Sequence, residues 1–117
     1  MKIALGTDHA GYLLKEVLKK RLTDDGHTVL DAGTHSREAV DYPDFIREAC
    51  ELVIRGEAER GIVLGGSGQG ECIAANKLPG IRAALCHDTY TARMSPEHNN
   101  ANVLSLGARV IGEGRPV

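Results

Sequence analysis

The sequence lacks a strong excess of either charge, since 14 basic and 16 acidic residues among 117 leave a formal net charge of -2. Such a balance gives no reason to expect nucleic acid or an acidic membrane as a partner. Long hydrophobic runs are missing too, because no stretch approaches the roughly 20 apolar residues of a membrane span. The first residues, Met1 to Leu5, have the pattern of a strand rather than of a signal peptide.

The sequence also lacks a C-x-x-C pair of cysteines and histidines at a spacing typical of metal ligands. The three cysteines (Cys50, Cys72 and Cys86) are odd in number and form no C-x-x-C pair. Reduced thiols in a cytoplasmic protein are therefore expected. The five histidines show no H-x-x-x-H spacing, and the cysteines do not complement them, so no metal site is expected.

Short apolar runs alternate with helical patterns along the whole chain. A helical face formed by Leu14, Val17, Leu18 and Leu22, with Lys15 pointing away from it, should end at Gly26 in a left-handed cap. A second helix should begin near Pro43 and end before Gly56. The five strands are expected at 3–5, 29–30, 62–64, 81–85 and 103–106.

This alternation predicts one domain over residues 1–117 with a three-layer α/β/α, Rossmann-like, doubly wound fold. Its five-stranded sheet should be mainly parallel and covered on both faces. In such sheets ligands bind at the carboxyl ends of the strands. Three polar loops should meet there: Thr7 to Gly11, Gly65 to Glu71, and His87 with Asp88.

The segment Gly65-Gly66-Ser67-Gly68-Gln69-Gly70-Glu71 is the most informative of these loops. It fails the dinucleotide pattern G-x-G-x-x-G, because Glu71 stands at the position of the third glycine. It also fails the phosphate-binding P-loop pattern, because Glu71 and Cys72 replace the required lysine and hydroxyl residue. Nucleotide binding is therefore not expected.

Two interpretations of the glycine loop remain open. Successive backbone N–H groups can hold an oxyanion such as an enediolate, and a carboxylate beside them can remove the proton that creates it. Ser67 could then move protons between neighbouring oxygens. Alternatively, the loop is a tight turn and Glu71 is a solvated acid in the first helical turn, where the helix dipole favours it.

Each of the other polar residues, taken alone, is weak evidence for a functional site. Asp8 and His9 offer an acid and an imidazole, or a helix cap and an exposed loop residue. His98 lies in Glu97-His98-Asn99-Asn100, which is a possible acid-base site or a polar turn. Arg109 could bind phosphate or form a surface ion pair. Cys72 is interpreted as a buried helix residue rather than a nucleophile, since Glu71 opposes thiolate formation.

Taken together, several motifs resemble the ribose-5-phosphate isomerase B family, which includes galactose-6-phosphate isomerase subunits. The resemblance covers residues 3 to about 112. It is carried by Gly6-Thr7-Asp8-His9-Ala10-Gly11, Asp41-Tyr42-Pro43, Gly65 to Gly70, Ile73-Ala74-Ala75-Asn76-Lys77, Gly80-Ile81-Arg82-Ala83-Ala84 and Glu97-His98-Asn99-Asn100-Ala101-Asn102-Val103.

The resemblance implies an aldose-ketose isomerase that converts ribose 5-phosphate and ribulose 5-phosphate through an enediolate, without metal or organic cofactor. Many members carry a cysteine base where this chain has Gly65; a second branch uses a glutamate directly after the loop, as at Glu71. Glu71 would then be the base, with Ser67, His98 and Asp8 assisting at the hydroxyl and ring oxygens. Substrate-binding positions would be Asp8, His9, Tyr42, Gly66, Ser67, Gly68, Gln69, Gly70, Asn99 and Arg109.

The family also implies a homodimer, or a dimer of dimers, whose sites are shared because the His98 and Arg109 equivalents come from a second subunit. Members usually continue beyond Gly112 into a C-terminal helix with further phosphate-binding arginines, which this 117-residue sequence lacks. Two alternatives stay beside the leading hypothesis, the first because the sequence does not reveal pocket depth and the second because of the missing helix. One is a six-carbon substrate such as allose or galactose 6-phosphate, and the other is a non-catalytic sugar-phosphate-binding subunit.

Overall fold

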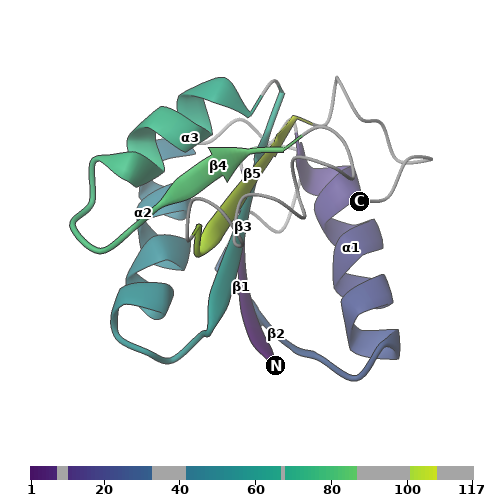
Figure 1. Ribbon diagram of the computed structural model, residues 1–117. Coiled ribbons are helices and arrows are strands. Elements are labelled where there is room, and N and C mark those ends of the chain that lie inside the picture. Colours follow the sequence, from purple (N-terminus) through teal and green to yellow (C-terminus); the bar gives the residue numbers. More distant parts are fainter. Residues whose placement is uncertain (8–10, 33–41, 67, 87–100, 108–117) are drawn as a thin grey trace.

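The computed structural model describes residues 1–7, 11–32, 42–66, 68–86 and 101–107, with the backbone alone for residues 42–44 (Figure 1). Five strands form one sheet in the order β2-β1-β3-β5-β4, and every neighbouring pair is parallel. The strands are β1 (Lys2–Thr7), β2 (Thr28–Asp31), β3 (Arg60–Gly65), β4 (Ala83–Leu85) and β5 (Val103–Gly107). The predicted five-stranded parallel α/β fold is confirmed.

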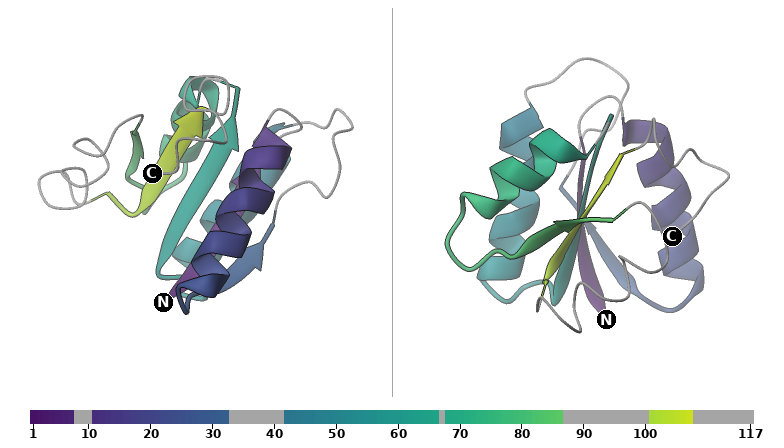
Figure 2. Two further views of the ribbon diagram at one scale, coloured as in Figure 1. Left: turned by 90° about the vertical axis from the view of Figure 1, so that its right-hand side faces the viewer. Right: turned by 45° about the horizontal axis from the view of Figure 1, so that its top comes forward.

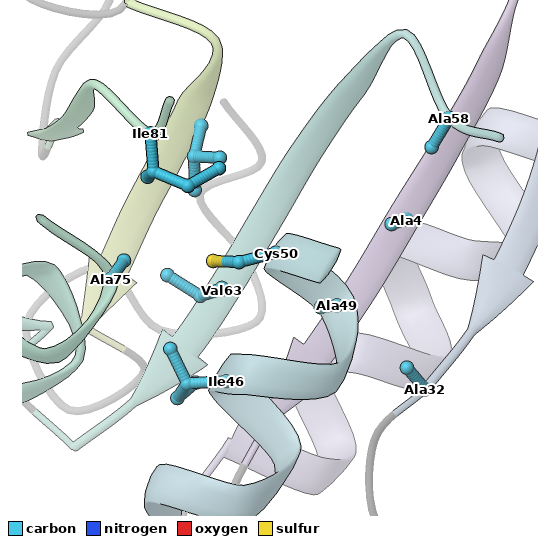
Figure 3. Close-up of a cluster of buried hydrophobic side chains, with 10 residues drawn as sticks. Ala4, Ala32, Ile46, Ala49, Cys50, Ala58, Val63, Ala75 and Ile81 are labelled. Atoms are coloured by element: carbon cyan, nitrogen blue, oxygen red, sulfur yellow. The ribbon is translucent and has the colours of Figure 1, made fainter. Parts of the chain in front are cut away.

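Three helices in the described part of the chain cover the two faces of the sheet. Helix α1 (Tyr12–Asp24) lies on one face, and α2 (Tyr42–Ile54) and α3 (Gln69–Asn76) lie together on the other (Figure 2). Apolar side chains of α2, among them Ile46 and Cys50, point toward Val63 of β3 in the core between these layers (Figure 3). Burying a side chain such as Ile46 stabilises the fold by about 1.5–3 kcal/mol.

Helix α1 ends as predicted, but the face that it buries differs from the prediction. Gly26 has a φ of 93°, and the amide of His27 donates to the carbonyl of Leu22, which completes a left-handed cap. Lys15 is fully buried, whereas Val17 is exposed. The prediction was wrong here because Lys15 finds an acidic partner, Asp31, beneath the helix.

Strand β4 begins at Ala83, two residues later than the predicted start at Ile81. Residues Leu78 to Ile81 form a turn instead, in which the Ile81 amide donates to the Leu78 carbonyl and Gly80 has a φ of 89°. Ile81 is buried in the core from this turn, so its apolar character reflects packing rather than strand pairing. The Asn76 side chain accepts from the amide of Ala83 and donates to its carbonyl, which attaches the end of α3 to β4.

Candidate active site

The glycine loop lies at the carboxyl edge of the sheet, between the end of β3 and the start of α3. Its neighbours on either side are the carboxyl ends of β1 and β5, because Thr7 pairs with Leu64 and Gly65 pairs with Gly107. The carboxyl ends of these three strands therefore lie side by side. This edge is where parallel α/β sheets bind ligands.

Glu71 and Gly65 lie in direct contact across the loop. A Cβ placed on Gly65 would overlap the carboxyl carbon and both oxygens of Glu71, so the carboxylate lies directly against the Gly65 Cα. Only 6% of Glu71 is exposed, although it belongs to the first turn of α3. The interpretation of Glu71 as a solvated acid is therefore wrong. The helix N-terminus offsets part of the cost of burying its charge.

Gly68 shapes the second half of the loop. It caps α3 with a φ of 82°, in the left-handed region that favours glycine. A Cβ on this residue would lie 2.8 Å from Cδ1 of Leu85 and 2.9 Å from the carbonyl carbon of Leu106. The loop thus packs closely against β5, and no residue larger than glycine would fit at position 68.

Thr7 and Gly11 both contact the carboxyl end of β3. The Thr7 hydroxyl donates to the carbonyl of Leu64 at 3.2 Å. A Cβ on Gly11 would collide with the Thr7 hydroxyl and approach the Leu64 Cβ to 2.8 Å. Thr7 and Gly11 therefore both lie next to Leu64, one residue before the glycine loop.

Helix α2 also begins near this edge. The backbone oxygen of Phe45 and the Cβ of Ala49 would both lie 2.8 Å from a Cβ on Gly6, near the carboxyl end of β1. Tyr42 is the first residue of α2, so its backbone belongs to this end of the sheet, while its side chain lies outside the described part of the chain.

Five of the predicted site residues lie between the end of β3 and the first turn of α3. These are Gly66, Gly68, Gln69, Gly70 and Glu71. The other predicted residues lie outside the described ranges: Asp8, His9, Ser67, His98, Asn99 and Arg109, together with His87 and Asp88 of the third polar loop.

Three polar side chains that the sequence reasoning did not expect to be buried lie in the described part of the fold, two of them (Thr7 and Ser105) beside the loop. Thr7, Lys15 and Ser105 all have fully buried side chains. Lys15 Nζ lies 2.9 and 3.2 Å from the two carboxylate oxygens of Asp31 and 5.3 Å from the centre of the Tyr12 ring. A polar residue that interrupts a strand, as Ser105 does between Leu104 and Leu106, was the available signal.

Cys72 is a half-buried residue of α3 rather than the fully buried one expected. Its thiol donates to the carbonyl of Ala83 at 3.5 Å. Burial, and to a lesser degree the nearby Cys86, raises the pKa of the Cys72 thiol. It is therefore protonated at neutral pH, which agrees with its interpretation as a structural residue and not a nucleophile.

The described residues 1–7, 11–32, 42–66, 68–86 and 101–107 contain no group of three His, Cys, Asp or Glu side chains placed to hold a metal ion. None of the helices within these ranges has the length and apolar character needed to cross a membrane.

Comparison with known proteins covers nearly the whole chain. A profile of the ribose/galactose isomerase family matches residues 3–116. Ribose-5-phosphate isomerase B of Escherichia coli (strain K12) is 45% identical over 111 residues, which cover 95% of this chain and 74% of that protein. The protein of the same name from Mycobacterium tuberculosis (strain H37Rv) is 45% identical over 111 residues, covering 94% of this chain and 68% of the relative.

Solved structures agree in fold and sequence. Ribose-5-phosphate isomerase B of Clostridium thermocellum superposes with a TM-score of 0.96 at 55% identity, covering 98% of this chain and 78% of that one. The Thermotoga maritima ribose 5-phosphate isomerase superposes with a TM-score of 0.94 at 47% identity. The match covers 97% of this chain and 79% of that one. These matches confirm the predicted family and enzyme class: the chain belongs to the ribose/galactose isomerase family, the family of ribose-5-phosphate isomerase B.

Proposed function

We propose that this protein interconverts ribose 5-phosphate and ribulose 5-phosphate through an enediolate, with Glu71 as the base. The observation that carries the proposal is the buried Glu71 carboxylate, placed against Gly65 at the start of α3. The relatives named ribose-5-phosphate isomerase B support the choice of substrate.

The reaction follows from the chemistry of a carboxylate beside backbone donors. Glu71 removes the proton from C2 of the open-chain aldose, and the electron pair moves onto the carbonyl oxygen to give the enediolate. Backbone N–H groups of Gly66 to Gly70 stabilise its negative charge. The protonated Glu71 then returns the proton to C1 while the C2 oxygen becomes the carbonyl, so no atom or electron is gained or lost.

The remaining roles come from the resemblance to the family. Ser67 would move protons between the two hydroxyl oxygens, and His98 with Asp8 would open the furanose ring. The binding residues would be His9, Tyr42, Gln69, Asn99 and Arg109. This scheme needs neither a metal nor an organic cofactor, because each proton transfer has a side chain assigned to it.

The contact between Gly65 and Glu71 supports the glutamate as base over a cysteine at position 65. A cysteine there would place its Cβ within the Glu71 carboxylate, so the two bases cannot share the site in this arrangement. This steric conflict supports the branch of the family that has glutamate as the base.

Substitution of Glu71 tests the proposal. Glu71→Gln keeps the shape of the side chain but cannot accept the C2 proton, so the isomerisation rate should fall about 100- to 10,000-fold. Glu57→Gln is the matched control, since Glu57 is an exposed acid paired with Arg55. Glu71→Gln with the rate of the unsubstituted protein would rule out Glu71 as the base.

A six-carbon sugar phosphate is the second candidate substrate, because the family description includes galactose isomerases. Both substrates would use the same mechanism, and pocket depth would decide between them. Comparing kcat/KM for ribose 5-phosphate, allose 6-phosphate and galactose 6-phosphate separates the candidates. Binding of these sugars without turnover would instead indicate a non-catalytic binding subunit.

We further propose a cytoplasmic homodimer, or a dimer of dimers, in which His98 and Arg109 complete the site of the neighbouring subunit. The resemblance to the family supports this assembly. Mixing Glu71→Gln with His98→Asn protein tests it: each variant alone should be inactive, but mixed dimers should contain one intact site out of two. The absence of any recovery after subunit exchange would contradict shared sites.

A further inference from the structure

Two buried hydroxyl groups hold the two ends of the glycine loop. Thr7 of β1 and Ser105 of β5 are both fully buried, and their strands flank β3 on either side. The Thr7 hydroxyl donates to the carbonyl of Leu64 at 3.2 Å, just before the loop. The Ser105 hydroxyl donates to the carbonyl of Gly68 at 2.5 Å, where the loop enters α3. We call this pair the hydroxyl clamp.

The sheet itself gives no reason for hydroxyl groups at these positions. Ser105 lies between Leu104 and Leu106 in a strand whose other residues are apolar or glycine. A buried hydroxyl group costs free energy unless it forms a hydrogen bond, and alanine or valine would avoid that cost. Thr7 donates to Leu64, the residue that precedes the glycine loop, and Ser105 donates to Gly68 within it, so the two hydrogen bonds bracket the first half of the loop.

The hydrogen bond from the Ser105 hydroxyl group is one of two that fix the Gly68 carbonyl at the start of α3. The Gly68 carbonyl also accepts the first helical hydrogen bond, from the amide of Cys72 at 3.0 Å, so both of its lone pairs are engaged. The carbonyl of Ser105 accepts from the amide of Cys86, which connects the same strand to β4. The left-handed turn at Gly68 is therefore held from the sheet as well as from the helix.

We propose that Thr7 and Ser105 are positioning residues that hold the glycine loop, and with it Glu71, in the reactive geometry. This inference rests on the proposed isomerase function. Catalytic groups must be held to within about 0.5 Å of their productive positions, and a loop containing four glycines within six residues (Gly65 to Gly70) has little rigidity of its own. Neither residue needs to touch the substrate for this role.

The test compares Thr7→Val and Ser105→Ala, alone and combined, with two controls. Thr7→Ser keeps the buried hydroxyl group. Thr23→Val removes an exposed hydroxyl group that also donates to a carbonyl, that of Lys19 at 2.7 Å, far from the loop in sequence. All variants are assayed at a temperature at which circular dichroism shows them to be fully folded.

Each clamp variant should lower kcat about 5- to 10-fold, because the loss of one hydrogen bond lets the loop and Glu71 leave the reactive geometry part of the time. Amide hydrogen exchange at Gly66 and at Gly68 to Glu71 should become faster in the same variants. Both controls should match the unsubstituted protein. Should Thr7→Val fail to fold, Ser105→Ala decides the question alone.

An unchanged kcat in the folded clamp variants would overturn the proposal, as would loop exchange at the original rate. Failure of the proposed function gives a different result, because the unsubstituted protein would then show no isomerase activity. In that case the exchange rates still report whether the hydroxyl clamp holds the loop.

Discussion

The carboxylate of Glu71 occupies the space in which the Cβ of any larger residue at position 65 would lie. Gly65 ends β3 and Glu71 lies in the first turn of α3, so the contact closes the glycine loop on itself. Position 65 accommodates only glycine because the buried Glu71 carboxylate fills the space beside its Cα. This relationship connects the local sequence to the proposed role of Glu71 as the base.

Enlarging Gly65 should therefore be harmful only while Glu71 is present. Gly65→Ala should lower the free energy of unfolding by about 1–3 kcal/mol, the usual cost of overpacking. In a Glu71→Ala background the same change should cost much less, because the carboxylate is gone. A double-mutant cycle measured by urea unfolding checks this, and purely additive effects would contradict the contact.

The buried ion pair between Lys15 and Asp31 should contribute strongly to stability. The Lys15 side chain has no exposed surface and that of Asp31 only 9%. Lys15→Met should lower the free energy of unfolding by up to about 3–5 kcal/mol, because the Asp31 carboxylate loses its buried partner and keeps the partly exposed Lys19 at 3.3 Å.

Lys20→Met is the matched control on the same helix, since its pair with Asp24 is largely exposed. It should change the free energy of unfolding by about 0.5 kcal/mol or less. Equal effects of the two substitutions in urea unfolding would show that burial does not strengthen the Lys15 pair.

Cys50 should make stability depend on pH in the alkaline range. Burial, and secondarily the neighbouring Glu51, raises the pKa of its thiol from 9.0 to about 11. Between these values the unfolded chain loses the proton while the folded chain keeps it. The contribution of this group to stability is therefore complete below pH 9 and is lost as the pH rises toward 11.

The pH series is measured by urea unfolding, with Cys50→Ala as the comparison. The variant should be less stable at neutral pH because of the cavity, but its unfolding free energy should fall less steeply between pH 9 and 11. Identical slopes for both proteins would show that Cys50 does not cause the decline.

Most of the fold could be predicted from the sequence because its strands and helices follow regular apolar patterns. The errors arose where tertiary contacts override the local pattern. Lys15 is polar and was placed on the outer face, but Asp31 from β2 makes its burial favourable. Ile81 was assigned to a strand, but it is buried from a turn.

The candidate site was predicted only in part for a similar reason. The glycine loop and Glu71 are adjacent in sequence, so their grouping was visible before the structure. The contributions of Thr7 and Ser105 were not, because each hydroxyl group acts on a carbonyl more than 30 residues away in the chain. Such long-range hydrogen bonds leave no periodic pattern in the sequence.

The most direct measurement is deuterium incorporation into the sugar phosphate during isomerisation in D₂O, for the unsubstituted protein and for Glu71→Gln. An enediolate mechanism with Glu71 as base predicts deuterium at the carbon that receives the proton, and its near-complete loss in Glu71→Gln, with binding of the substrate retained. Incorporation by Glu71→Gln at the rate of the unsubstituted protein would contradict the central claim.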